Sequence, residues 1–274
     1  MKLIRQSFEI IKQKSGLEGI YKQIELSGRT CYKSEDNITE DSARGFVEKL
    51  IELGHLAMLE HGTVYLKIPI NTLTGYLTSK YGINKYCFTR VDNYNRYYYV
   101  TTNLRVLVER EWLSDLKYIC EPTEFHQPRI TVRFITDQGI LREFTRHRTF
   151  SFAVESTRYC NYSKRKFNNE ITYIYPCWLP DGDLSQEADE CFKYSLQKAE
   201  QAYFHLLDQG WKPQQARNVL PLATKCEIVM TGFVNDWKHF FNLRCDKAAH
   251  PQAQELAISL KEEFIKKGFI DSPQ

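Results

Sequence analysis

The sequence predicts an α+β fold in which a mixed or antiparallel sheet is flanked by helices. Segments with helical periodicity and segments that alternate like strands follow one another in irregular order, without regular β-α-β alternation. The chain also lacks a Gly-x-Gly-x-x-Gly turn, which argues against a Rossmann dinucleotide fold. Its 274 residues, 42% of them hydrophobic, can bury one large core. We therefore expect a single domain over residues 1–274.

The charge balance limits the classes of partner. The 37 basic and 34 acidic residues leave a net charge of only +3, so long-range attraction to nucleic acid or to an anionic membrane is weak. No apolar run approaches the roughly 20 residues that span a bilayer, and the amino terminus lacks the core of a signal peptide. The eight cysteines are scattered without a C-x-x-C pair. We expect a cytoplasmic protein that binds no nucleic acid, membrane or metal.

The first half of the chain predicts a helix, a strand and an insertion. Residues Asp41 to Leu53 carry apolar side chains at three- and four-residue spacing, and Thr63 to Ile70 alternate as a strand. From Asn71 to about Pro128 the sequence becomes rich in tyrosine, with a helix expected from Leu104 to Cys120. Tyrosine suits half-buried interfaces, so this segment favours a sheet or subunit-contact surface over a ligand cage. We interpret it as an insertion between core elements.

The second half predicts alternating short strands and amphipathic helices. A helix that Asp137 caps is expected to run to about Arg146, so the polar segment that follows lies at and beyond a helix end. The other expected elements are strands at Ile130 to Ile135, Ile171 to Tyr175 and Glu227 to Phe233, and helices at Asp183 to Gln209, before Pro221, through Trp237 to Leu243, and from Pro251 to about Lys267.

The stretch from Arg146 to Tyr159 carries the densest set of reactive side chains. It gathers three arginines, a histidine, two serines, a glutamate and a tyrosine between apolar spacers. Arginine occupies every basic position except the histidine, and its planar guanidinium binds phosphate or carboxylate oxygens two at a time. The stretch therefore predicts a site for an anion with flat rings.

The spacing of this stretch resembles the signature of the flavin-dependent thymidylate synthases, the ThyX family. The matching residues are the triplet Arg146-His147-Arg148 and, further on, Ser156, Arg158 and Tyr159. The middle departs from the family pattern, because many members carry Asn-Glu where this chain has Ala153-Val154, and the only acid here is Glu155.

Three further segments resemble the family in the same order along the chain: Glu60-His61-Gly62-Thr63, Ala216 to Pro221 with Arg217, and Asn235 to Arg244. Each also has a structural interpretation. A single histidine before a strand is more often a hydrogen-bonding residue of the core, and an arginine at a helix end often forms a salt bridge or faces the helix dipole. Their order along the chain favours the functional interpretation for Arg217 and Arg244.

The resemblance implies reductive methylation of dUMP to dTMP, with methylenetetrahydrofolate as carbon donor and NADPH-reduced FAD as hydride donor. It implies that Arg244 is catalytic and stabilises negative charge on the pyrimidine, so that C5 acts as a nucleophile. It also implies a homotetramer with shared active sites. The implied dUMP contacts are Arg146, Ser156, Arg158, Tyr159, Arg217 and Arg244, and the implied FAD contacts are His61, Thr63, Arg146, His147, Arg148, Asn235 and His239.

Other interpretations stay open at this point. A related flavin-dependent enzyme that hydroxymethylates a pyrimidine nucleotide would keep the same chemistry, and the Ala153-Val154 departure allows it. A nucleic-acid-binding protein could use the arginines and aromatic residues for phosphate contact and stacking, although the small net charge disfavours it. Cys160 could act as a nucleophile beside the cationic stretch. A structural role for it is favoured, because the resemblance implies no enzyme nucleophile.

Overall fold

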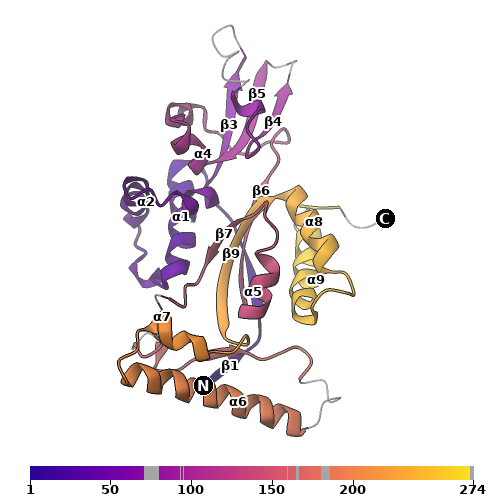
Figure 1. The fold of residues 1–274 in the computed structure, drawn as a ribbon. Helices are drawn as coiled ribbons and strands as arrows, with labels where there is room; N and C mark the ends of the chain where they lie inside the picture. Colours follow the sequence, from indigo (N-terminus) through magenta and orange to yellow (C-terminus); the bar gives the residue numbers. More distant parts are fainter. Residues whose placement is uncertain are drawn as a thin grey trace.

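A four-stranded antiparallel sheet forms the centre of the molecule. The computed structural model describes residues 1–70, 80–92, 94, 96–158, 160–164, 167–179 and 186–271. The central strands run in the order β2-β6-β9-β7, and β6 and β9 pair over nine residues (Figure 1). Their bounds are Ser7–Ile11 for β2, Arg129–Asp137 for β6, Lys225–Phe233 for β9 and Ser151–Val154 for β7. Together with the flanking helices, this sheet confirms the α+β class.

Helices cover both faces of the central sheet. Helix α1 (Gly16–Tyr32) contacts β7 and β9 on one side, with α2 (Ser42–Glu52) packed against it. The other side is covered by α5 (Gln138–Phe144), α8 (Val234–Arg244) and α9 (Pro251–Lys266), as Figure 1 shows.

The main hydrophobic core lies between the central sheet and helices α5, α8 and α9. Val132 and Phe134 alternate along β6 toward these helices, as the two-residue period of a strand requires. Trp237 of α8 is fully buried there, and its indole nitrogen donates a hydrogen bond to the carbonyl oxygen of Ile130 at 3.1 Å. Because this polar atom is satisfied, the large ring can be buried without an unpaired donor.

A second sheet lies beyond the end of the central one. Its order is β3 (Thr63–Pro69), β5 (Tyr97–Asn103) and β4 (Phe88–Asp92), all antiparallel. Tyr98 and Tyr99 of β5 are buried, so these tyrosines belong to a sheet. Residues 71–79 lie outside the described part of the chain, and the interpretation of 71–128 as an insertion stays a prediction.

The expected helix from Leu104 to Cys120 is wrong in its length. Helix α4 spans only Leu104–Glu109 and is followed by a 3-10 turn at Leu113–Tyr118. Glu111 between them adopts a left-handed backbone with φ of 59°, and the amide of Trp112 turns back to the carbonyl oxygen of Leu107 at 2.7 Å. The chain reverses here and lets Trp112 pack on the core, which helical periodicity could not reveal.

The third unit lies at the opposite end of the central sheet. Strand β1 (Lys2–Ile4) pairs in parallel with β8 (Thr172–Ile174), so this two-stranded sheet is parallel, whereas the two larger sheets are antiparallel. Helix α6 (Gln186–Asp208) runs beneath them and packs against the short helix α7 (Pro213–Ala216) (Figure 1). The expected start of α6 at Asp183 lies outside the described residues.

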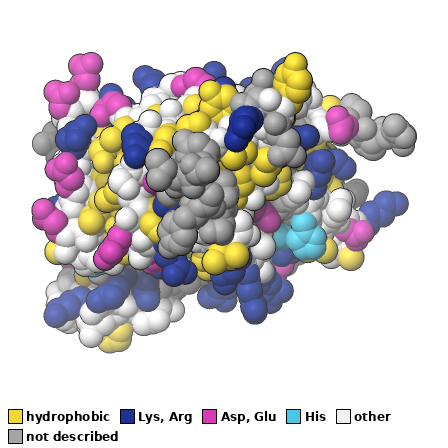
Figure 2. Space-filling model, turned by 90° about the horizontal axis from the view of Figure 1, so that it is seen from above, with side chains coloured by type: hydrophobic (Ala, Val, Ile, Leu, Met, Phe, Trp, Pro, Cys, Tyr) yellow, Lys and Arg dark blue, Asp and Glu magenta, His cyan; other side chains and the backbone are white. Residues whose placement is uncertain are grey.

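Most of the other predicted elements are confirmed. The Asp137 carboxylate caps α5 by accepting the Ile140 amide at 2.8 Å, although α5 ends at Phe144, before the expected Arg146. Helix α1 was missed by the sequence interpretation. Among the described residues, no helix is long and apolar enough to cross a bilayer. On the face seen in Figure 2, basic side chains lie among acidic and apolar ones.

Candidate active site

The segment from Arg146 onward runs along an edge of the central sheet. It leaves the end of α5, forms edge strand β7 and reaches the vicinity of α7. The Phe150 ring anchors it, because it packs edge-on against Trp237 at 4.7 Å between ring centroids. Gly232 of β9 makes room for that ring, since a Cβ there would lie 2.6 Å from it. The residues before β7 and the residues after it therefore lie at opposite ends of this strand.

The first group of predicted site residues gathers between α5 and α8. The Arg244 guanidinium donates from Nε to Nε2 of His147 at 2.9 Å and from Nη1 to Oε2 of Glu143 at 2.8 Å. Its Nη2 donates to the carbonyl oxygen of Glu143 at 2.5 Å. The His239 ring lies 6.2 Å from the His147 ring. Segments that are 97 residues apart thus meet at one place.

The cations of this group differ in their exposure. Arg244 is held in place with 12% of its side chain exposed, whereas the Arg146 side chain is 73% exposed and pairs with Glu143 at 3.5 Å. Arg148, Asn235 and His239 are exposed as well. Exposed guanidinium groups beside a fixed one suit an anion with several oxygens.

His147 is buried in its neutral form. Its Nε2 accepts a hydrogen bond from Arg244, so its proton must reside on Nδ1. Burial, the Arg244 charge and nearby His239 lower the pKa of His147 from 6.5 to about 4. At neutral pH the imidazole ring therefore accepts this hydrogen bond and fixes the direction of the Arg244 guanidinium.

The depressed pKa of His147 predicts a loss of stability in acid. The unfolded chain takes up this proton near pH 6.5 and the folded chain only near pH 4, so stability is lost as pH falls through this window. For His147 alone, we expect the free energy of unfolding to fall by about 2 kcal/mol between pH 7 and pH 5. Urea unfolding of the wild type and of His147→Gln, whose amide oxygen can still accept from Arg244, measures this term. Equal pH dependence in both proteins would contradict it.

The second group of predicted site residues lies at the far end of β7. Arg158 donates from Nε to Oε1 of Gln214 at 3.2 Å, and Arg217 donates from Nη1 to Oγ1 of Thr157 at 3.0 Å. Both arginines are exposed, and Ser156 is partly buried. The structure thus brings Arg158 and Arg217 to one surface, as the resemblance implies, but apart from Arg244. Tyr159 lies outside the described residues.

His61 and Thr63 are enclosed by the protein. His61 is 0% exposed, and its Nδ1 lies 2.8 Å from Oγ1 of Thr231. Burial and the charge of Arg129 lower the pKa of His61 to about 3. Thr63 is also buried, and its backbone pairs with the Gln13 amide through two hydrogen bonds of 2.8 Å. These contacts fit the structural interpretation of the histidine, and a flavin contact there stays a prediction.

His55 is an accessible histidine that the sequence did not single out. It is exposed and lines a cavity of about 530 Å³ together with Ala57, Cys31, Tyr32 and Arg105. His55 caps the start of a short 3-10 helix, and His61 is the last residue of the same helix. Periodicity could not tell which of them faces solvent, because only the packing of that helix decides it.

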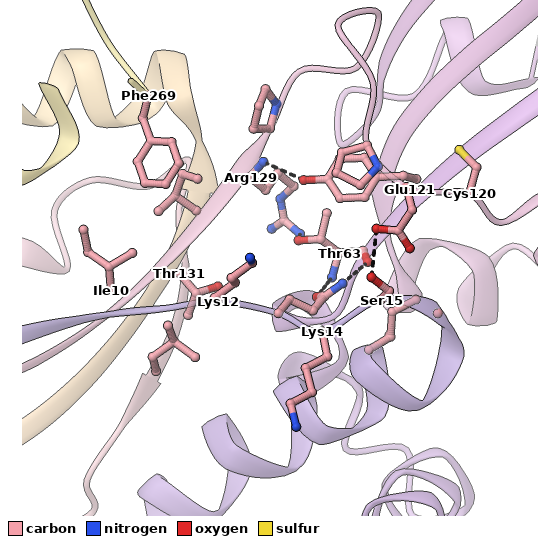
Figure 3. Close-up of a pocket in the computed structure, with 18 of the residues that line it drawn as sticks. Ile10, Lys12, Lys14, Ser15, Thr63, Cys120, Glu121, Arg129, Thr131 and Phe269 are labelled. Atoms are coloured by element: carbon pink, nitrogen blue, oxygen red, sulfur yellow. Dashed lines mark hydrogen bonds between the residues drawn. The ribbon is translucent and has the colours of Figure 1, made fainter. Parts of the chain in front are cut away.

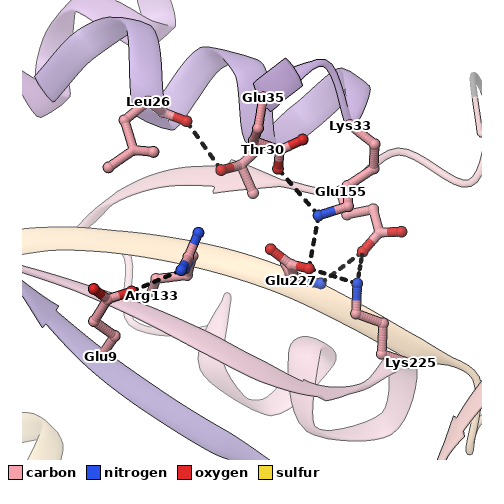
Figure 4. Close-up of polar contacts among 9 residues, drawn as sticks. All are labelled: Glu9, Leu26, Thr30, Lys33, Glu35, Arg133, Glu155, Lys225 and Glu227. Carbon is pink, nitrogen blue, oxygen red and sulfur yellow. Dashed lines mark hydrogen bonds and ion pairs between the residues drawn. The ribbon is translucent and has the colours of Figure 1, made fainter. Parts of the chain in front are cut away.

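Glu155 belongs to a buried charge cluster rather than to a ligand surface. Lys225 Nζ lies 2.8 Å from Oε2 of Glu155 and 2.6 Å from Oε1 of Glu227, and Lys33 reaches Glu227 at 2.7 Å (Figure 4). Burial raises the pKa of Glu155, against the opposing charge of Lys225. Ala153 is buried as well, and Val154 is partly buried against the main core. Glu155 therefore cannot replace the acid that many family members carry two residues before the signature serine.

Cys160 has the surroundings of a structural residue. Only 1% of it is exposed, and it packs in the core beneath β8 with Tyr162 and Tyr203. Among the described residues, no three His, Cys, Asp or Glu side chains are placed to hold a metal ion.

Known proteins are similar to this chain in sequence. A family model described as thymidylate synthase complementing protein matches residues 92–267. The flavin-dependent thymidylate synthase of Synechocystis sp. is 29% identical over 147 residues, which cover 52% of this chain and 68% of the relative. The corresponding enzyme of Mycobacterium sp. (strain JLS) is 24% identical over 250 residues, covering 90% of this chain and 77% of the relative.

A viral relative agrees with these two. The probable flavin-dependent thymidylate synthase of Paramecium bursaria Chlorella virus 1 is 30% identical over 149 residues, which cover 52% of this chain and 68% of the relative. The family match includes β6, β7, β9 and both arginine groups described above. The chain belongs to the thymidylate synthase complementing protein family.

Proposed function

We propose that this protein is a flavin-dependent thymidylate synthase, a methyltransferase that converts dUMP to dTMP. Methylenetetrahydrofolate is the proposed carbon donor, and NADPH the proposed reductant of FAD. The contact between Arg244 and His147 carries the proposal, because it joins two family segments that are 97 residues apart around one fixed cation. The names of the relatives support the reaction.

The residues between α5 and α8 fit a flavin nucleotide. Arg146 and Arg148 present exposed guanidinium groups suited to a diphosphate, and His239 and Asn235 add polar groups from α8. His147 would act through Arg244 and its neighbours, because it is buried. Bound FAD, once reduced, supplies the hydride. His61 and Thr63 would then support the site from within, with His55 as the exposed histidine of that region.

Arg158, Arg217 and Ser156 are the proposed holders of dUMP, with Tyr159 and Arg146. Their two exposed guanidinium groups suit the phosphate. Arg244 is the proposed catalytic residue. Three of its nitrogens donate to Glu143 and His147, and a guanidinium has five N–H groups, so two remain for the pyrimidine. A fixed cation there stabilises negative charge on the ring as N3 shares its proton.

A shared site in a homotetramer fits the separation of the two groups. Strand β7 stands between them, and its four residues span more than about 10 Å. A nucleotide held by Arg158 and Arg217 of one subunit could meet Arg244 of another. We therefore propose that the active site is completed by neighbouring copies of the chain.

Flavin binding provides the first test of the proposal. We expect the purified protein to be yellow or to take up FAD, and to consume NADPH faster when dUMP is added. Arg148→Gln should weaken FAD binding by about 10- to 100-fold, as expected for the loss of charged hydrogen bonds. Arg142→Gln, which changes an exposed arginine of α5 outside the signature, is the matched control and should bind FAD normally. A protein that cannot be reconstituted with FAD would contradict the proposed function.

A further inference from the structure

A second large cavity opens at the edge of the central sheet opposite the arginine-rich segment. Its volume is about 610 Å³, within the range of small-molecule sites. Edge strand β2 and the start of β6 form one wall, and the beginning of α1 and the turn at Ile119–Pro122 form another. Apolar side chains line much of it, among them Ile130. Ile10 and Phe269 are seen on the same side of the cavity in Figure 3.

The cavity is distinct from the two arginine groups described above. No arginine of the two groups lines the cavity, although Arg129, which does, reaches Oγ of Ser151 in β7 at 3.3 Å. Of the predicted ligand contacts, Thr63 alone lines this cavity.

Arg129 places a partly buried positive charge at the cavity. Its guanidinium donates to the carbonyl oxygen of Glu60 at 2.9 Å, to Oγ1 of Thr63 at 3.4 Å and to Oγ of Ser151 at 3.3 Å. All three acceptors are neutral, and the Glu60 carboxylate is itself occupied by Arg105 at 2.6 Å. Burial lowers the pKa of Arg129. Within the described chain, no carboxylate lies within ion-pair distance of this guanidinium.

Arg129 is a partly buried cation without a carboxylate partner, and nearby charges make the cavity more positive still. Lys12, Lys14 and Lys267 stand exposed around it, against one acid, Glu121. Glu121 already accepts a hydrogen bond from the Ser15 hydroxyl at 2.8 Å. Figure 3 shows Arg129 between the apolar side, with Ile10 and Phe269, and the polar side, with Ser15 and Glu121. Such surroundings favour a ligand that brings negative charge and an apolar body.

We propose that this cavity is a second ligand site that binds a small organic anion with an apolar body. The carboxylate or phosphate of the ligand pairs with the Arg129 guanidinium and the surrounding lysines. Its apolar part lies against Ile10, Ile130 and Phe269. The proposed site does not depend on dTMP formation, so it is tested separately from the proposed function.

Two fluorescent probes of the same shape test the proposal. Anilinonaphthalene sulfonate carries one negative charge, and N-phenylnaphthylamine is its neutral counterpart. Both are titrated into protein saturated with FAD and dUMP. We expect the anionic probe to bind at least about 10-fold more tightly, as one charged hydrogen bond in a buried site would give. Equal affinity for the two probes, or no binding of the anion, would overturn the proposal.

Matched lysine variants locate the probe. The Lys12→Gln/Lys267→Gln double variant changes exposed side chains and should fold normally, keep dTMP formation and bind the anion several-fold more weakly. Lys266→Gln, a neighbouring exposed lysine that does not line the cavity, should bind it as the wild type does. Unchanged binding in the double variant would overturn the assignment.

Arg129 itself and the proposed substrates complete the test. Arg129→Met should abolish the preference for the anionic probe, and the lysine variants keep the test decisive if this protein fails to fold. Displacement of the bound anion by excess FAD or methylenetetrahydrofolate would assign the cavity to the proposed reaction and overturn a separate site. Failure of FAD to bind at all would instead count against the proposed function, and the matched lysine variants would then still show whether the anionic probe binds this cavity.

Discussion

Replacing Arg244 by alanine is expected to lower the rate of dTMP formation by about 10²- to 10³-fold, the usual effect of removing one donor to a developing negative charge. The Arg244 guanidinium is fixed before substrate arrives, by His147 on one side and Glu143 on the other. A fixed donor needs no reorganisation as charge develops, so its loss affects turnover more than binding. FAD should still bind, because Arg146 and Arg148 remain. The rate under single turnover and the FAD affinity are the two measurements.

The control for Arg244 must separate chemistry from folding. Removing the cation leaves the partly buried Glu143 carboxylate without its main partner, so some stability is also lost. The Arg244→Ala/Glu143→Gln double variant removes that unpaired charge and should recover stability but not turnover. Arg244→Lys keeps the charge but loses the planar fork, and should stay well below wild type. Wild-type turnover in Arg244→Ala would remove this residue from its proposed catalytic role.

Replacing Lys225 by methionine is expected to lower the free energy of unfolding by about 3–5 kcal/mol, as breaking a buried ion pair usually does. Lys225 is the shared partner of the Glu155 and Glu227 carboxylates, at 2.8 and 2.6 Å. Glu155 is 3% exposed, so its charge has no access to water once the lysine is gone. Urea unfolding at neutral pH measures the loss.

Two comparisons test the cause of this loss. Lys193→Met removes a lysine whose ion pair with Asp189 lies at the surface, with 42% of the lysine exposed, and should lower the free energy of unfolding far less than Lys225→Met does. Lys225→Met combined with Glu155→Gln replaces the most deeply buried charge by a neutral amide and should restore part of the stability. Similar losses in the free energy of unfolding for Lys193→Met and Lys225→Met would show that the buried cluster does not stabilise the chain after β7.

Local signals predicted the fold well where they were strong. The Asp137 cap, the alternation at Thr63 and the periodicity after Asp41 each correspond to an observed element. The break after Glu109 escaped prediction, because the left-handed backbone at Glu111 is imposed by packing of Trp112 and leaves no turn residue in the sequence.

The sequence predicted which segments form the candidate site, but it did not predict the contacts between their side chains. Family resemblance pointed to His147 and Arg244, which do meet. Glu143 carries no motif, yet it contributes two of the three acceptors that hold Arg244. The cavity beside Arg129 combines residues from both ends of the chain, so only the folded structure could bring them into view.

Mass spectrometry of the nucleotide formed from dUMP tests the proposed function most directly. The protein is incubated with dUMP, methylenetetrahydrofolate, NADPH and FAD, and the pyrimidine product is isolated. A product that has gained a methyl group at C5, and that is missing when FAD is omitted from flavin-free protein, is the expected result. A hydroxymethyl group at C5, or unchanged dUMP in the presence of bound flavin, would contradict it.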